Sequence, residues 1–139
     1  MPDIFAQYLR EEAMREIFTG SSPEKNGSES TQTAVERIDA YLASNAIVLF
    51  MKGSPDFPQC GFSARVVNAL RTCRATFTHV NILEDAELRQ ALKTYASWPT
   101  FPQLYVEGEF VGGCDIVMDL YQSGDLSKMI RQAGAVFTE

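Results

Sequence analysis

A cysteine directly before a predicted helix is the residue of this chain best suited to do chemistry. Cys60 follows a predicted strand and precedes a predicted helix that starts at Gly61. At the start of a helix, unpaired backbone N–H groups and the positive end of the helix dipole favour a thiolate. Lys52, at the end of the preceding strand, adds a positive charge, and both effects lower the pKa of a cysteine. Cys60 could therefore act as a nucleophile or as a metal ligand.

The residue three positions after Cys60 limits this chemistry. In dithiol redox motifs that position holds the resolving cysteine, but here it holds Ser63. The chain cannot close a disulfide within such a motif, so the sulfur of Cys60 needs an external partner. That partner is either a second thiol molecule or a metal centre that takes one ligand from each subunit.

The other cysteines and the single histidine carry weaker signals. The three cysteines are not spaced as CxxC or as a zinc-ligand set. Cys73 lies at the far end of the predicted helix, where the dipole is reversed, so we assign it a structural role. Cys114 follows two glycines and stays open; one alternative is a disulfide between Cys60 and Cys114 that acts as a redox switch. His79 lies in a predicted strand, and we expect no chemistry from it.

Composition limits the classes of protein that the chain can belong to. It has 139 residues, with 12 Lys and Arg against 18 Asp and Glu, so its formal net charge is −6. An acidic chain without a basic stripe is not expected to bind nucleic acid. The longest apolar run, residues 46–51, is far shorter than the roughly 20 residues that cross a bilayer, so no membrane partner is expected. Residues 1–20 lack the features of a secretory signal or a mitochondrial presequence, which predicts a cytoplasmic protein.

The chain divides near residue 32. Residues 20–32 contain no large apolar residue and are rich in Gly and Ser, which is typical of a flexible linker. Apolar residues within 4–18 recur at helical spacing and predict an amphipathic helix. That helix could be a frayed appendage, dock a partner or fold back onto the domain, and these alternatives stay open. We therefore expect an N-terminal extension over 1–32 and one folded domain over 33–139.

From residue 33 the pattern predicts alternating helices and strands. Thr33 and Glu36 form a capping-box pattern that opens the first helix. Further helices are expected over 61–74, 86–97 and around 116–122 and 126–133, and strands over 46–52, 77–83, 103–106 and 109–111. This order predicts an α/β fold of the thioredoxin-like kind, with a mixed four-stranded sheet flanked by helices.

Four separated motifs carry a resemblance to a known family. They are Lys52-Gly53, Pro58-Gln59-Cys60-Gly61-Phe62-Ser63, Trp98-Pro99-Thr100-Phe101-Pro102-Gln103-Leu104-Tyr105 and Gly112-Gly113-Cys114-Asp115-Ile116. In this order and spacing they resemble the monothiol CGFS glutaredoxins over residues 33–135, and the single-domain bacterial members in particular. A lone CGFS tetrapeptide would not establish the resemblance.

The resemblance implies a site for glutathione. Lys52 and Arg89 would hold the glycine carboxylate by charge-assisted hydrogen bonds. The backbone of Phe101, which precedes an expected cis-Pro102, would pair with the cysteinyl unit like an added strand. Where the commonest family version has Ile, this chain has Phe101, which leaves the backbone contact intact and changes the side chain over the ligand.

The γ-glutamyl end of glutathione would lie at a glycine turn. The turn at Gly113 would bring the backbone N–H groups of Cys114 and Asp115 to the γ-glutamyl carboxylate, and the Asp115 side chain would take the ammonium group. The glutathione sulfur would then lie beside Cys60. The complete set of site residues that the resemblance implies is Lys52, Cys60, Gly61, Phe62, Arg89, Thr100, Phe101, Pro102, Gly113, Cys114 and Asp115.

The resemblance also implies a function as a carrier. Two subunits would each give Cys60, and two glutathiones would each give a thiol, to hold one [2Fe-2S] cluster between the subunits of a homodimer. A cluster held half by dissociable ligands should be labile and transferable to apo iron–sulfur acceptor proteins. The resemblance further implies a role in cluster assembly and iron homeostasis, and a BolA-like protein that would replace one subunit.

The alternative is an enzyme, a glutathione-dependent thiol–disulfide oxidoreductase that uses Cys60 as nucleophile for deglutathionylation. Ser63 permits this chemistry because the resolving thiol comes from outside. Residues 53–59 form a longer loop than in dithiol glutaredoxins, and the resemblance implies weak activity of this kind, so we favour the carrier. Under both hypotheses we expect Cys60→Ser to abolish cluster binding and thiol chemistry, and Cys73→Ser to change little.

Overall fold

Helix α2 (Ala34–Ser44) begins at the predicted capping box. The Glu36 backbone N–H donates to Thr33 Oγ1 at 3.1 Å, and the Thr33 N–H donates to Glu36 Oε1 at 2.9 Å. These two bonds satisfy donors that a helix start otherwise leaves unpaired. The computed structural model describes residues 32–136. The amphipathic helix expected within 4–18 and the linker expected over 20–32 lie, but for Gln32, outside the described residues.

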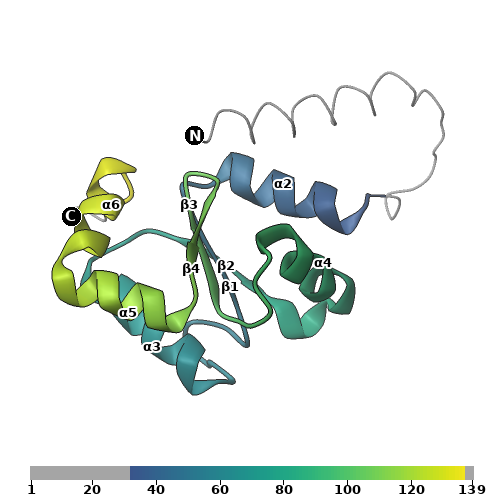
Figure 1. Cartoon of the computed structure of the whole chain (residues 1–139), viewed down its shortest axis with the longest axis horizontal. Coiled ribbons are helices and arrows are strands. Elements are labelled where there is room, and N and C mark those ends of the chain that lie inside the picture. Colours follow the sequence, from purple (N-terminus) through teal and green to yellow (C-terminus); the bar gives the residue numbers. More distant parts are fainter. Residues whose placement is uncertain (1–31, 137–139) are drawn as a thin grey trace.

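The remaining elements follow the predicted order (Figure 1). They are β1 (Ile47–Met51), α3 (Gly61–Thr72), β2 (Thr78–Asn81), the 3₁₀ helix η3 (Ile82–Glu84), α4 (Ala86–Ala96), β3 (Gln103–Val106), β4 (Glu109–Gly112), α5 (Cys114–Ser123) and α6 (Asp125–Gln132). The thioredoxin-like α/β fold predicted from the sequence is confirmed.

The strands form one mixed sheet in the order β2-β1-β3-β4. Strand β1 is parallel to β2 and antiparallel to β3, and β3 is antiparallel to β4. Leu49 in β1 therefore lies between His79 of β2 and Leu104 of β3. The central position of β1 explains why all five of its residues are apolar and buried.

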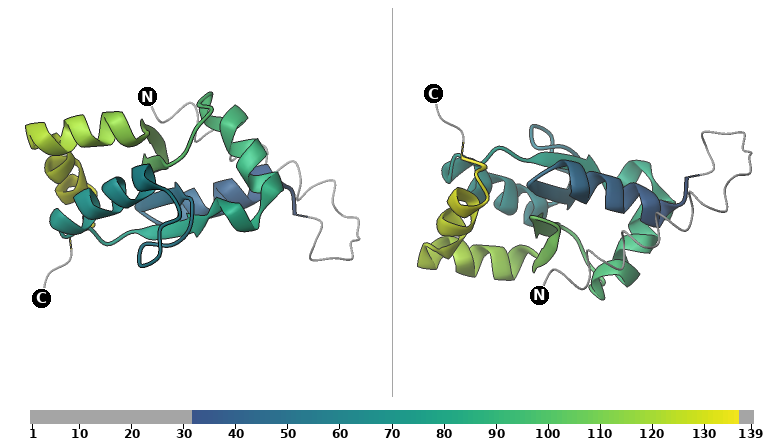
Figure 2. Two further views of the ribbon diagram at one scale, coloured as in Figure 1. Left: turned by 90° about the horizontal axis from the view of Figure 1, so that it is seen from below. Right: turned by 90° about the horizontal axis from the view of Figure 1, so that it is seen from above.

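Helices cover both faces of the sheet (Figures 1 and 2). Alternate residues of β1 point to opposite faces, so Leu49 packs in one apolar cluster and Phe50 in the other. The cluster around Leu49 includes residues of α3, α5 and α6, and the cluster around Phe50 includes residues of α2 and α4. The two clusters fix α3 and α5 on the same face, so that both helices start near the same edge of the sheet.

Several element boundaries differ from the sequence prediction by one or two residues, and two of these differences have a clear cause. The second strand ends at Asn81 instead of residue 83, because the Asn81 side chain accepts a hydrogen bond from the Leu83 N–H at 3.0 Å and starts the 3₁₀ turn. Helix α5 begins at Cys114 instead of about residue 116, because the Val117 N–H already donates to the Gly113 carbonyl at 3.0 Å.

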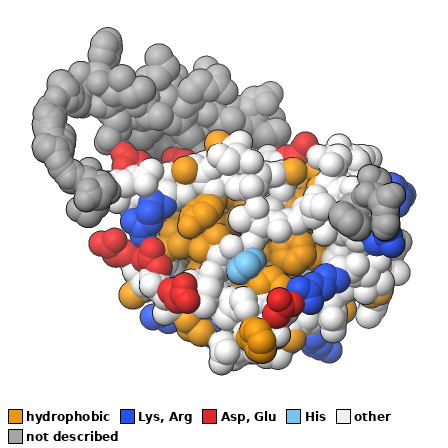
Figure 3. Space-filling model, turned by 180° about the vertical axis from the view of Figure 1, so that it is seen from behind, with side chains coloured by type: hydrophobic (Ala, Val, Ile, Leu, Met, Phe, Trp, Pro, Cys, Tyr) orange, Lys and Arg blue, Asp and Glu red, His pale blue; other side chains and the backbone are white. Residues whose placement is uncertain are grey.

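The surface of the molecule is mixed in character. Figure 3 shows one face on which apolar, acidic and basic side chains are interspersed, and His79 in β2 is exposed. Among residues 32–136, no helix has both the length and the apolar character that a membrane span requires.

Candidate functional site

Cys60 lies at the N-cap of α3, as predicted. At the start of this helix, the backbone N–H groups of Ser63 and Phe62 donate to the Cys60 sulfur. Partial burial raises the pKa of Cys60, but these hydrogen bonds and the positive charge of Lys52 outweigh it. The pKa of Cys60 therefore lies below its ordinary value, which favours the thiolate.

Ser63 has a structural role that the sequence did not reveal. Its side chain is buried, and its hydroxyl accepts a hydrogen bond from the Lys52 backbone N–H at 3.2 Å. The same hydroxyl interacts with the Cys60 sulfur and lowers the pKa of that thiol. Ser63 thus joins the end of β1 to the start of α3 at the point where the reactive sulfur lies.

The loop between β1 and Cys60 is held by backbone hydrogen bonds. The Gln59 N–H donates to the Lys52 carbonyl at 2.9 Å, and the Gly53 N–H donates to Asn81 Oδ1 at 2.9 Å. Gly53 has a φ of +93°, and a Cβ there would lie 2.6 Å from the Gln59 nitrogen, so only glycine fits. The loop therefore returns the chain to the end of β1 and fixes Cys60 near Lys52.

The segment before β3 forms a wall of the site. The Phe101–Pro102 peptide bond is cis, as predicted. Buried Gln103 supports this segment, because its side-chain amide donates to the Trp98 carbonyl at 3.1 Å and its Oε1 accepts from the Tyr105 hydroxyl at 3.1 Å. Among the described residues, none forms a hydrogen bond with the backbone of Phe101.

The glycine turn before α5 packs against this wall. A Cβ at Gly113 would lie 2.9 Å from Trp98 Nε1 and 3.3 Å from the Pro102 carbonyl oxygen. Trp98 also packs against Phe110, with ring centroids 5.5 Å apart. Because glycine alone allows this approach, Gly113 brings the start of α5 to the cis-proline.

Cys114 is the first residue of α5 and a near neighbour of Cys60. Burial raises the pKa of Cys114, although the Arg65 side chain donates a hydrogen bond to its sulfur and opposes this effect. The negative charges of Asp115 and Cys60 raise the pKa of Cys114 further. The three cysteines are free thiols, so the Cys60–Cys114 disulfide considered from the sequence remains a hypothesis.

Cys73 lies at the C-cap of α3, at the other end of the helix from Cys60. Burial raises the pKa of Cys73, and the nearby Arg131 charge and Ser127 hydroxyl only partly offset it. These surroundings favour the thiol over the thiolate, in keeping with the structural role assigned to Cys73.

The start of α5 offers unpaired donors to an anion. Within the described part of the chain, no side chain caps this helix, and its first intrahelical bond runs from the Val117 N–H to the Gly113 carbonyl. The backbone N–H groups of Cys114 and Asp115 therefore remain open, as a carboxylate site requires. Asp115 itself is exposed, so its side chain is accessible to a ligand.

The structure brings some of the predicted site residues together. Contacts and charge interactions connect Lys52, Cys60, Phe62 and Cys114, and packing at Gly113 connects this group to Pro102. Gly61 and Thr100 are exposed beside these residues in the chain, and Phe101 is buried. Arg89 is half-buried on α4, and within residues 32–136 no contact links its side chain to Cys60.

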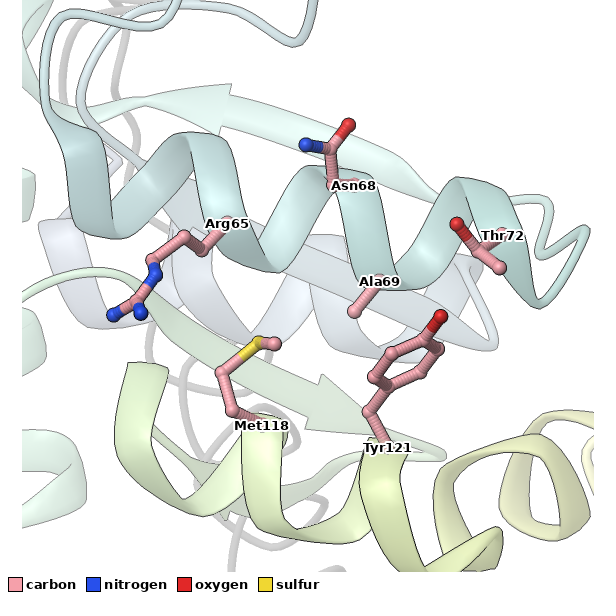
Figure 4. Close-up of a pocket in the computed structure, with 6 residues that line it drawn as sticks. All are labelled: Arg65, Asn68, Ala69, Thr72, Met118 and Tyr121. Atoms are coloured by element: carbon pink, nitrogen blue, oxygen red, sulfur yellow. The ribbon is translucent and has the colours of Figure 1, made fainter.

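A shallow cavity of about 130 Å³ lies between α3 and α5 (Figure 4). Its lining residues are Arg65, Asn68, Ala69, Thr72, Met118 and Tyr121. Figure 4 shows the Arg65 side chain reaching from α3 toward α5. The sequence analysis missed Arg65, because a single arginine at helical spacing gives no signal until the fold brings it to Cys114.

Known proteins resemble most of this chain. The glutaredoxin family model matches residues 47–111. Glutaredoxin 4 of Escherichia coli strain K12 is 50% identical over 105 residues, which cover 76% of this chain and 91% of that protein. Monothiol glutaredoxin-S17 of Arabidopsis thaliana is 42% identical over 130 residues, which cover 94% of this chain and 26% of that protein.

Solved structures agree with the sequence relatives. The solution structure of reduced poplar apo GrxS14 is 53% identical, with a TM-score of 0.67 over 75% of this chain and 95% of that chain. The crystal structure of a buckwheat glutaredoxin–glutathione complex is 25% identical, with a TM-score of 0.67 over 75% of this chain and 93% of that chain. The chain shares half of its aligned residues with Glutaredoxin 4 and carries a single cysteine in its CGFS motif, and it belongs to the monothiol glutaredoxin family.

Proposed function

We propose that this monothiol glutaredoxin binds glutathione and carries a labile [2Fe-2S] cluster between two subunits, for transfer to apo iron–sulfur proteins. The observation that supports this proposal best is the state of Cys60. It is a low-pKa thiol at the start of α3, and the position of a resolving cysteine is occupied by buried Ser63. A thiolate in these surroundings is available to an external sulfur or to iron.

Glutathione would use groups that have no partner in the described part of the chain. A buckwheat glutaredoxin that resembles this chain is solved in complex with glutathione. In this chain the free backbone of Phe101 could pair with the cysteinyl unit, and the open N–H groups at the start of α5 could take the γ-glutamyl carboxylate. Lys52 and Arg89 are the candidate cations for the glycine carboxylate.

The cluster would be cargo that this chain cannot enclose alone. In residues 32–136, no group of three His, Cys, Asp or Glu side chains could hold a metal ion. A [2Fe-2S] cluster takes four ligands, which two Cys60 thiolates and two glutathione thiolates would supply. Because half of these ligands dissociate with a small molecule, the cluster is suited to transfer, and a BolA-like partner could replace one subunit.

A second candidate function follows from the same low pKa of Cys60. The Cys60 thiolate would attack the glutathione sulfur of a protein–glutathione disulfide, form a Cys60–glutathione disulfide and release the protein thiolate. A second glutathione thiolate would then attack that disulfide, release oxidised glutathione and regenerate Cys60. This cycle needs only glutathione as reductant and makes the chain a deglutathionylating oxidoreductase.

Anaerobic reconstitution with iron, sulfide and glutathione tests the proposal. We expect a visible chromophore that forms only with glutathione, on a dimer that contains one glutathione per subunit. Cys60→Ser should abolish the chromophore, and Cys73→Ser, the matched control, should keep it. A colourless monomer that rapidly reduces a glutathione mixed disulfide would refute the carrier and establish the oxidoreductase.

A further inference from the structure

One side-chain oxygen at the end of β2 accepts hydrogen bonds from two separate segments. Asn81 Oδ1 accepts from the Gly53 N–H at 2.9 Å and from the Leu83 N–H at 3.0 Å. Because both donors are backbone N–H groups, the shared acceptor must be the amide oxygen of the side chain. We propose that Asn81 is a positioning residue of the candidate glutathione site, which holds Lys52 and Arg89 in place by joining the loop after β1 to the turn before α4. This inference rests on the proposed function, in which both cations bind the glycine carboxylate.

The hydrogen bond from Gly53 places Lys52. Asn81 pairs in register with the last residue of β1, so it lies directly beside the point where the loop begins. The peptide unit between Lys52 and Gly53 is bonded at both ends. Its carbonyl accepts from the Gln59 N–H at 2.9 Å, and its N–H donates to Asn81. Without Asn81, the N–H end of this peptide unit loses its partner and the loop that carries Lys52 is held from one side only.

The hydrogen bond from Leu83 places Arg89. By accepting this N–H, Asn81 starts the 3₁₀ helix η3, which leads directly to the N-cap of α4. That N-cap is Asp85, whose side chain accepts from the Leu88 N–H at 3.0 Å. The Arg89 N–H donates to the Asp85 carbonyl at 3.0 Å, so Arg89 lies one turn after the cap. The turn that Asn81 starts therefore sets where α4 begins and where Arg89 lies.

Helix α4 has further anchors on α2. Arg37 forms an ion pair with Asp85 at 2.7 Å, and the Tyr95 hydroxyl donates to Asp39 Oδ1 at 2.9 Å. These contacts should keep α4 on the sheet when Asn81 is replaced. Within residues 32–136, however, no hydrogen bond connects residues 53–59 directly with residues 82–96, so the two segments are joined through Asn81. Loss of this side chain should uncouple the two segments without unfolding the domain.

The charges of Lys52 and Arg89 explain why such a joint matters. Two cations that bind one carboxylate have the same sign, so they repel each other before the ligand arrives. Anchoring the backbone on both sides reduces the cost of ordering them when the ligand binds. The effect of Asn81 should therefore be specific for a ligand that carries the glycine carboxylate.

The test compares Asn81→Ala with Asn45→Ala, the matched control. Asn45 is also half-buried, and its Oδ1 accepts from the Thr78 hydroxyl at 2.8 Å at the other end of β2. Both variants should lower the urea midpoint. In NMR titrations of the apo protein, we expect Asn81→Ala to raise the glutathione dissociation constant at least about fivefold, and Asn45→Ala to match the wild type.

A modified ligand separates positioning from a general loss of stability. Glutathione with an ethyl ester on its glycine carboxyl lacks the charge that the two cations would bind, so its dissociation constant should be the same in Asn81→Ala and in the wild type. Asn81→Ser is a second, milder variant. Its oxygen can still accept from Leu83 within the turn but lies one bond closer to the backbone than the oxygen that reaches Gly53. We expect faster hydrogen exchange of the Gly53 N–H and weaker glutathione binding in this variant too.

The outcomes separate this inference from the proposed function. Wild-type glutathione affinity in both Asn81 variants, or equal losses for glutathione and its ester, would overturn the inference and leave the carrier intact. A wild-type protein that binds glutathione but forms no chromophore on reconstitution would refute the carrier, and the titrations would still decide the role of Asn81. A wild-type protein that binds no glutathione would refute both.

Discussion

At the scale of single residues, the chemistry of the site depends on the pKa values of its thiols. Cys60 and Cys114 lie near the centre of the site, and Cys73 lies at the far end of α3. Burial raises the pKa of Cys73 and Cys114, but at Cys60 the hydrogen bonds of the first helical turn and the Lys52 charge prevail. Since the thiolate is the reactive form, the same residue type is reactive at one end of a helix and inert at the other.

This difference predicts the pH dependence of alkylation. A lowered pKa means that the Cys60 thiolate is present at lower pH than an ordinary cysteine thiolate, and a raised pKa means the reverse for Cys73. In variants that retain one cysteine each, the midpoint of the iodoacetamide rate against pH should therefore be lower for Cys60 than for Cys73. Equal midpoints, or a lower one for Cys73, would contradict the electrostatic description of the site.

Ser63→Ala should change both the thiol and the stability of the fold. The substitution removes the hydroxyl that supports the Cys60 sulfur and leaves the Lys52 N–H without its partner. We expect the alkylation midpoint of Cys60 to rise and the free energy of unfolding in urea to fall by about 1–2 kcal/mol. Ser44→Ala, at the exposed end of α2, is the control and should alter neither quantity.

Gly113→Ala should disturb the wall of the site. The added Cβ would lie 2.9 Å from Trp98 Nε1 and 3.3 Å from the Pro102 carbonyl, so the indole or the turn must move. We expect a loss of about 1–3 kcal/mol in unfolding free energy, weaker glutathione binding and a shift in fluorescence of this single tryptophan. Gly61→Ala meets no atom within 4 Å and should not be destabilising, because alanine is the better helix former.

At the scale of elements, the capping box of α2 should contribute measurably to stability. Thr33→Ala removes the hydroxyl that accepts the Glu36 N–H at 3.1 Å. A lost N-cap costs typically about 1 kcal/mol, so the urea midpoint should fall by a corresponding amount. Thr94→Ala makes the same chemical change at an exposed position inside α4, where no decrease is expected. Equal losses in both variants would show that the cap contributes nothing of its own.

The sequence predicts elements well where the signal is local. Thr33 and Glu36 identify the start of α2, and the apolar run in β1 identifies the central strand. It fails at the end of β2, where Asn81 both starts a turn and accepts a hydrogen bond from the Gly53 N–H. Whether a side chain continues a strand or caps a turn depends on a tertiary partner that spacing cannot reveal.

For the site too, the sequence predicts features that depend on neighbouring residues and misses contacts between distant segments. The N-cap position of Cys60 follows from local sequence, and the structure confirms it. The hydrogen bond that Ser63 accepts from the Lys52 N–H, just after β1, and the contact of Arg65 with Cys114 join segments that meet only in the folded chain. The role of Arg89 in a glutathione site was predicted from the family resemblance. The structure places Arg89 on α4 and does not test that role.

At the scale of the whole molecule, the two apolar clusters on opposite faces of the sheet fix where α3 and α5 begin. Both helix starts then lie near the cis-proline, and the donors of α5 and the low-pKa thiol lie at the same edge of the domain. Everything that the proposed function needs from one subunit is therefore concentrated on a small surface, and the remaining requirements fall to glutathione and a second copy.

The net charge predicts how salt acts on such a dimer. Two copies with a charge of −6 each repel one another, and raising the ionic strength from about 0.01 M to about 0.15 M shortens the screening length from about 30 Å to about 8 Å. The dissociation constant of the reconstituted dimer, measured by ultracentrifugation, should therefore fall as salt is added. Saturating glutathione keeps salt from acting through the candidate carboxylate contact of Lys52. A dimer that weakens with salt would instead require ion pairs between the copies, which would contradict the repulsion expected from the net charge.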